Sequence, residues 1–272
     1  MAENLSSGIA TPRWQGAWLP LFSGLVLFLL MLPTVIVIPM SFSDSSYLEF
    51  PPQQWSLRWY REYFGSEQWM SATWTSLQVA VLTTLIATPL GTVAAYGMSS
   101  LPARLRNGLQ LIVLMPLVVP VILVAVGVFH LYAKLGLNYT VAGVVLAHVA
   151  LALPFVVITV MSGLKGYDHN LELAARSLGA TRTRAFLTIT VPHLRFSIQT
   201  GAFLAFITSL DEVVVAMFVS GGENATITRR MFNALRDQID PTIAAISTCL
   251  IAVSVLSLAL VQLLASRQKA ER

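Results

Sequence analysis

The chain has 272 residues, of which 56% are hydrophobic and only 11% are charged. Soluble domains average about 25% charged residues, so this composition excludes an ordinary water-soluble domain. The formal net charge of +4 comes from Lys and Arg placed between apolar segments, not from a basic stripe, which argues against nucleic-acid binding. Cys249 is the only cysteine, so the sequence offers neither an intramolecular disulfide nor a cysteine-based metal site.

Six apolar stretches follow one another along the chain, and each is long enough to cross about 30 Å of hydrocarbon as a helix. They cover residues 17–42, 73–99, 109–133, 141–164, 196–220 and 241–265. Helices are expected because lipid offers the backbone no other hydrogen-bond partner. The sequence therefore predicts an all-α, polytopic membrane protein with about six transmembrane helices.

The Lys and Arg residues in the connections set the predicted orientation. One side of the membrane would hold eleven of them and the other side six, so the first side is expected to be cytoplasmic. Both termini lie on that side, which predicts a membrane domain at 17–265 between cytoplasmic tails at 1–16 and 266–272. A cleaved signal peptide is the alternative for the first stretch, but its apolar run exceeds the usual signal core of about 7–15 residues.

The first outer connection contains a strongly aromatic segment. Trp59 and Tyr63, and likewise Tyr60 and Phe64, are four residues apart, so a helix here would carry aromatic rings on one face. Such a helix suits the membrane–water boundary, where the rings stay dry and the polar tips stay wet. A platform for a cationic ligand is the rival interpretation.

Two features inside the third and fourth stretches point to local distortion and packing. Pro116 and Pro120 lie one turn apart, which favours a bent helix that could line a cavity. His130 and His148 also lie inside these stretches. We predict that both are hydrogen-bonded packing residues and not parts of a proton relay.

The connection at 165–195 is long for a loop in a compact membrane protein, yet its pattern predicts order. Asp168 or Asn170 can cap a helix start. Apolar residues then recur at i, i+3, i+4 and i+7, namely at Leu171, Ala174, Ala175 and Leu178. This spacing predicts an amphipathic helix with one apolar stripe.

A tight turn and a second short helix are expected to follow. Gly179 is the predicted left-handed end of the first helix. The second helix can begin after Thr181, with Phe186 and Ile189 on one face, and is expected to end before Pro192. The periodicity leaves two interpretations open: a docking element for a partner protein, or an amphipathic loop on the inner leaflet.

The same segment carries a family resemblance. The residues ELAARSLGA at 172–180 and ITVP at 189–192 resemble the cytoplasmic "EAA" loop of ABC importer permeases. The two Ala residues, Gly179 and Pro192 stand at matching positions. The family's Glu aligns with Leu173, so Glu172 stands one residue earlier, about 100° around the helix.

The resemblance implies a type I ABC importer permease whose loop inserts into a groove on a cytoplasmic ATPase subunit. The residues that it assigns to this coupling are Glu172, Ala174, Ala175, Arg176, Leu178, Gly179, Ala180 and Pro192. ATP would be bound by the partner ATPase, because the chain has no Gly-x-x-x-x-Gly-Lys-[Ser/Thr] phosphate loop. We therefore expect no cofactor, metal site or catalytic residue in this chain.

Further patches are similar to the spermidine/putrescine branch of these permeases, which lies in the bacterial inner membrane. They are EFPP at 49–52, SLRWY at 56–60, SLDEVVV at 209–215 and FVSG at 218–221. This branch implies a heterodimer with a second permease, two ATPases and an external solute-binding protein. Related permeases carry opines, aminophosphonates or other small solutes, so these solutes remain alternative cargoes.

Asp211 and Glu212 interrupt the fifth apolar stretch and are candidates for the substrate path. A charged side chain at the centre of a spanning helix costs about 2.5–3.5 kcal/mol and usually faces the bundle interior or a water-filled path. A carboxylate there would suit a cargo with ammonium groups, and the resemblance favours Asp211. The structural alternative places one or both acids near the outer interface, paired with Arg or backbone groups.

Two other function classes are weaker interpretations. A secondary transporter or channel could use Asp211 and Glu212 as an ion site, but the ordered 165–195 segment would then have no purpose. A membrane-embedded enzyme would need reactive side chains at helical spacing, such as a Ser–His pair, and no predicted span contains one.

Overall fold

The computed structural model describes residues 13–237 and 240–270. Within these ranges the chain is mostly helical, and its extended pairing is limited to one isolated bridge between Ser43 and Trp55. The predicted all-α class is therefore confirmed.

The long helices follow the apolar stretches. They are α1 (Arg13–Met40), α3 (Glu67–Ser99), α4 (Ala103–Val118), α5 (Val121–Leu135), α6 (Val141–Leu164), α10 (Arg195–Asp211) and α13 (Thr242–Ala270). The shorter elements are α2 (Arg58–Gly65), α7 (Asn170–Ser177), α8 (Arg182–Ala185), the π-helix η1 (Phe186–Thr190), α9 (Val191–His193), α11 (Val214–Val219), the 3-10 turn η2 (Gly222–Asn224) and α12 (Ile227–Asp237). Polar residues mark several starts: Ser66 caps α3 and Thr140 caps α6 through their side chains.

Four described helices are long and apolar enough to cross a membrane, namely α1, α3, α6 and α13. A fifth crossing is possible if α4 and α5 form one span, although they meet at an angle of 97°. The break lies at Val119–Pro120, so the bend predicted from Pro116 and Pro120 is confirmed. The count of six spans stays a prediction.

The fifth predicted stretch is broken at its acidic pair. Helix α10 ends at Asp211, and α11 starts only at Val214. At 17 residues, α10 is about 25 Å long, which is slightly less than the hydrocarbon thickness.

Helices α3, α6 and α10 form the centre of the molecule and pack against one another. Small residues allow this close approach, as they do between helices in membranes. Gly91 of α3 shows the constraint directly, because a Cβ atom there would lie 2.7 Å from Cβ of Val156 in α6. Ala87, Ala95 and Ala152 are fully buried in the same core.

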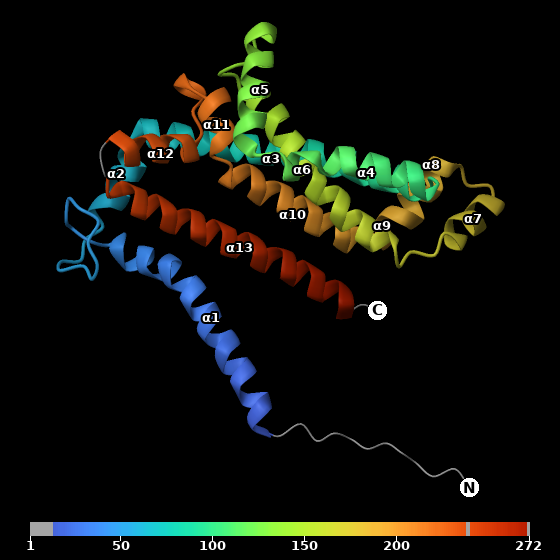
Figure 1. Cartoon of the computed structure of the whole chain (residues 1–272), viewed down its shortest axis with the longest axis horizontal. Coiled ribbons are helices and arrows are strands. Elements are labelled where there is room, and N and C mark those ends of the chain that lie inside the picture. Colours follow the sequence, from blue (N-terminus) through green and yellow to red (C-terminus); the bar gives the residue numbers. More distant parts are fainter. Residues whose placement is uncertain (1–12, 238–239, 271–272) are drawn as a thin grey trace.

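Figure 1 shows α3, α6, α10 and α13 running along the long axis, with α2 and α12 at one end and α7 and α8 at the other. Helix α5 projects to one side beside α11, which it contacts. Helix α1 contacts α13 but diverges from the bundle, and its apolar side chains, such as Leu21 and Leu30, are exposed.

The predicted aromatic helix is present as α2 and packs against α3 and α13. Trp59 and Tyr63 are buried, and the hydroxyl of Tyr63 lies 2.8 Å from that of Thr73. The hydroxyl of Tyr60 lies 2.7 Å from that of Ser41 at the end of α1. Three of the four rings or their polar tips thus hold the ends of neighbouring helices together, while Phe64 stays exposed.

Candidate functional site: the 165–195 segment and the carboxylates after α10

The 165–195 segment has the order that its sequence predicts. Helix α7 covers Asn170–Ser177, and the carboxylate of Asp168 accepts a hydrogen bond from the backbone N–H of Asn170 at 2.9 Å. Gly179 has a φ of +94° and ends this helix. Thr181 caps α8, since its hydroxyl accepts a hydrogen bond from the N–H of Arg184.

The predicted end before Pro192 is wrong. After α8 the chain continues through the π-helix η1 and through α9, which contains Pro192 in its first turn. Proline is tolerated there because the N–H groups of the first helical turn have no partner in the helix. The segment is therefore joined to α10 by nearly continuous helix, with one irregular residue at Leu194.

Apolar side chains of α7 and of the turn that follows it face outward. Leu178 is 89% exposed, and Leu171 and Leu173 are about half exposed. Ala174 is also exposed. Described residues of this chain leave this apolar surface uncovered, which is unusual next to a well-packed core.

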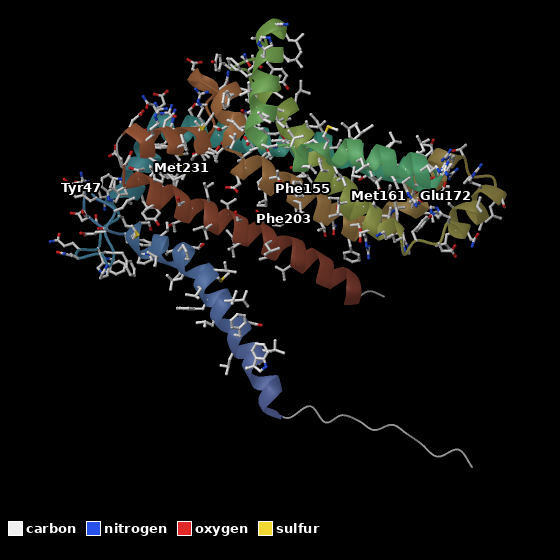
Figure 2. The ribbon with its side chains drawn as sticks, viewed as in Figure 1. Tyr47, Phe155, Met161, Glu172, Phe203 and Met231 are labelled. Carbon is white, nitrogen blue, oxygen red and sulfur yellow. The ribbon has the colours of Figure 1, made fainter. Side chains whose placement is uncertain are left out.

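Glu172 points the opposite way from these residues. It is only 6% exposed, and its carboxylate accepts a hydrogen bond from the hydroxyl of Tyr96 in α3 at 2.5 Å. It also accepts one from Thr190 in η1 at 3.3 Å. Figure 2 places it at the same end of the molecule as Met161 of α6. Glu172 therefore ties α7 to the end of α3 and to η1.

A Glu172→Ala variant is expected to loosen α7, because it leaves the hydroxyls of Tyr96 and Thr190 without their shared acceptor. Hydrogen bonds to a charged group contribute about 1.5–3 kcal/mol. Backbone amides of residues 170–180 should then exchange with deuterium faster than in the wild type, by roughly tenfold or more. Glu172→Gln keeps an acceptor oxygen and is the matched control; equal protection in all three proteins would contradict this role.

The two acids after α10 have different surroundings. The carboxylate of Glu212 accepts hydrogen bonds from the N–H groups of Val215 and Ala216, each at 2.9 Å, and so caps α11. Its side chain is only 8% exposed. Asp211 is exposed, and its side chain has no hydrogen bond or ion pair among the described residues.

His148 of α6 connects this break to the core. Its Nδ1 lies 2.8 Å from the hydroxyl of Ser209 in α10, and its Nε2 lies 3.7 Å from the Glu212 carboxylate. The residue is 1% exposed, so the prediction of a hydrogen-bonded packing role is confirmed for His148. His130 is exposed in α5 instead, and that prediction is wrong for it. The sequence did not reveal the Ser–His pair because its members belong to two different helices.

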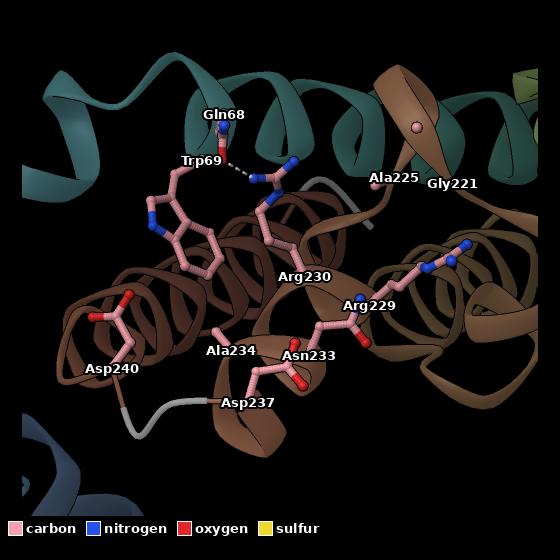
Figure 3. Close-up of a pocket in the computed structure, with 11 residues that line it drawn as sticks. Gln68, Trp69, Gly221, Ala225, Arg229, Arg230, Asn233, Ala234, Asp237 and Asp240 are labelled. Carbon is pink, nitrogen blue, oxygen red and sulfur yellow. Dashed lines mark hydrogen bonds between the residues drawn. The ribbon is translucent and has the colours of Figure 1, made fainter.

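A cavity of about 510 Å³ lies at the other end of the molecule, beside α12 and the start of α3. Figure 3 shows Arg230 directed at Gln68, to which it donates a hydrogen bond at 2.7 Å. Burial lowers the pKa of the Arg230 guanidinium. Nε of Arg230 and Nη1 of Arg229 are buried without a hydrogen-bond partner, so both retain donors for another molecule.

Residues 87–270 match the protein family described as "Binding-protein-dependent transport system inner membrane component". This match covers more than half of the chain. The chain belongs to this family. It is therefore a multi-pass protein of the bacterial inner membrane and a permease subunit of an ABC importer.

Two curated relatives are similar over most of their length. The putrescine transport system permease protein PotI of Escherichia coli K12 is 33% identical over 227 residues, which are 80% of either chain. The spermidine/putrescine transport system permease protein PotC of Haemophilus influenzae is 30% identical over 235 residues, covering 86% of this chain and 90% of the relative.

Solved structures confirm the fold. A chain of a bacterial ABC transporter for import of the acidic polysaccharide alginate matches with a TM-score of 0.70, 15% identity and coverage of 94% of this chain and 99% of that one. A chain of an amino acid ABC transporter with histidines matches with a TM-score of 0.55, 16% identity and coverage of 77% and 98%. At these identities the likeness concerns the fold alone.

Proposed function

We propose that this permease imports polyamines, with ATP hydrolysis supplied by two ATPase subunits, one of which docks on the turn between α7 and α8 of this chain. The observation that carries the coupling role is the outward-facing apolar surface of Leu171, Ala174 and Leu178 on an ordered helix–Gly–helix unit. An unanchored loop would gain nothing from such order. Glu172 then acts as a positioning residue that transmits motion of α7 to α3 and η1.

The coupling requires that residues 165–195 and both termini lie in the cytoplasm. The distribution of Lys and Arg supports this orientation, with eleven on that side and six on the other. The near-continuous helix from α8 through η1 and α9 to α10 supports a rigid transmission path from the ATPase to the break at Glu212.

A second, similar permease would complete the transport path, and an external solute-binding protein would deliver the cargo. The exposed apolar faces of α1, α4 and α5 support partner or lipid contacts along the bundle. The cavity with the free donors of Arg229 and Arg230 lies at the end opposite α7, on the side where a binding protein would dock.

The relatives named for putrescine and spermidine support a polyamine cargo. Asp211 supplies a matching group, because its exposed carboxylate is free of hydrogen bonds within the described chain and could face an ammonium group. Glu212 is less suited to this task, since its oxygens already accept two backbone N–H groups. We therefore propose that Asp211 lines the substrate path and that Glu212 holds the backbone beside it in place.

An Asp211→Asn variant is expected to reduce saturable polyamine uptake about tenfold or more, because one ion pair in a water-poor path contributes well over 1 kcal/mol. Uptake of labelled putrescine and spermidine is measured in cells that produce the whole transporter. Glu62→Gln, an exposed acid on α2, is the matched control and should transport normally.

The two failures of this experiment differ. Normal polyamine uptake by Asp211→Asn would show that Asp211 does not line the substrate path, but the proposal of a polyamine cargo would still hold. If the wild type moves no polyamine while its ATPases and binding protein are present, the cargo is another small solute, such as an opine, an aminophosphonate or an amino acid derivative.

A further inference from the structure

A second cavity, of about 360 Å³, lies between the end of α3, the first turns of α4 and the end of α6. Its charged and basic lining residues are Arg106, Lys165 and His169, and no carboxylate lines it. Asn107 and Gln110 add further polar groups from α4. A volume of this size falls within the usual range for small-ligand sites, about 300–1,000 Å³.

Two charged groups line this cavity, Arg106 and Lys165, and neither has an ion-pair partner within the described chain. The side chains of Arg106, Lys165 and His169 make neither a hydrogen bond nor an ion pair to any described residue. Positive groups gathered around one cavity repel one another unless an anion lies between them. The cavity therefore has the chemistry of an anion site whose anion comes from outside this chain.

The position of the cavity specifies the kind of anion. Ser99 ends α3, Arg106 lies in the first turn of α4 and Leu164 ends α6, so the cavity lies where the two candidate spans α3 and α6 end and α4 begins. Its apolar wall of Met161 and Leu164 adjoins α4, which has no buried residue among its 16. Leu111 and Ile112 of α4 are more than 60% exposed and could cover acyl chains.

We propose that this cavity binds the phosphate headgroup of an anionic phospholipid, whose acyl chains lie along α4. Basic pockets between helices at the cytoplasmic membrane surface are suited to such headgroups. The inference rests on the proposed orientation but not on the cargo or on ATPase coupling. Bound lipid would fix the start of α4 to the end of α6, beside the helix α7 that follows His169.

The test counts lipid molecules retained by the purified, complete transporter in native mass spectra, after exchange into detergent with phosphatidylglycerol or with phosphatidylcholine. Each Lys or Arg that contacts the headgroup inside the cavity is expected to contribute about fivefold to affinity. The double variant Arg106→Gln/Lys165→Gln should therefore bind phosphatidylglycerol roughly 25-fold more weakly. Arg104→Gln, on the same turn of α4 but outside the cavity, and the charge-preserving Arg106→Lys should bind it normally.

Three outcomes overturn the proposal. They are equal retention by the double variant and by Arg104→Gln, equal retention of phosphatidylglycerol and phosphatidylcholine by the wild type, and displacement of the lipid by inorganic phosphate at low millimolar concentration, which would indicate a site for free anions. The double variant must also copurify with its partners and unfold at the wild-type temperature. If it does not, Lys165→Gln alone takes its place, with a fivefold loss expected and wild-type binding counting against the proposal.

Discussion

A Gly179→Val variant is expected to lose at least about nine-tenths of its transport while it still inserts into the membrane and assembles with its partners. Gly179 has a φ of +94°, and a Cβ atom there would meet no other atom within 4 Å. The cost is therefore backbone strain, about 1–3 kcal/mol for a non-glycine residue and more for a β-branched one. The turn can relieve this strain only by changing the angle between α7 and α8.

Gly136→Val is the matched control for this variant. Gly136 ends α5 with a φ of +69°, and a Cβ atom at this position would likewise meet no other atom within 4 Å. It should suffer similar strain at a place that does not contact an ATPase. Uptake of labelled putrescine, normalised to the amount of assembled complex, distinguishes the two. Wild-type uptake by Gly179→Val would contradict the coupling role of the turn.

A Glu212→Ala variant is expected to destabilise the assembled permease by about 2–6 kcal/mol. Two backbone N–H groups of α11 would lose their acceptor, and each buried donor left unsatisfied costs about 1–3 kcal/mol. The cap that starts α11 next to the broken end of α10 would also be lost. The thermal unfolding temperature of the purified complex should fall by several degrees.

The neighbouring acid provides the control. Asp211→Ala should change the free energy of unfolding by no more than about 0.5 kcal/mol, because the Asp211 side chain is exposed and makes no hydrogen bond to the described chain. Glu212→Gln keeps one acceptor oxygen and should lie between the two. An unfolding temperature for Glu212→Ala equal to that of the wild type would show that the α11 cap is dispensable.

Local signals in the sequence predicted the local structure well. The spacing of Leu171, Ala174 and Leu178 predicted α7, Gly179 predicted its left-handed end, and Thr181 predicted the start of α8. These features depend on periodicity, backbone conformation and capping, which act over one or two turns. The bend at Pro120 belongs to the same class.

Contacts between distant segments were beyond reach of the sequence alone. Glu172 is hydrogen-bonded to Tyr96, which lies 76 residues away in the sequence, and His148 is hydrogen-bonded to Ser209, 61 residues away. Pairing of this kind depends on how α3, α6 and α10 pack, and packing leaves no local pattern. The prediction that the helix ends before Pro192 failed for another reason. Proline breaks a helix interior but is accepted in a first turn, and only the structure shows that α9 begins there.

Transport by the reconstituted complex tests the central claim most directly. The complete transporter is placed in proteoliposomes, with its binding protein on the face of the transporter that is external in the cell. Movement of labelled putrescine is followed with ATP or with a non-hydrolysable analogue. The account predicts saturable, directional movement with ATP, none with the analogue, and little with Gly179→Val. Equal movement with and without hydrolysable ATP would contradict it and would favour a secondary transporter.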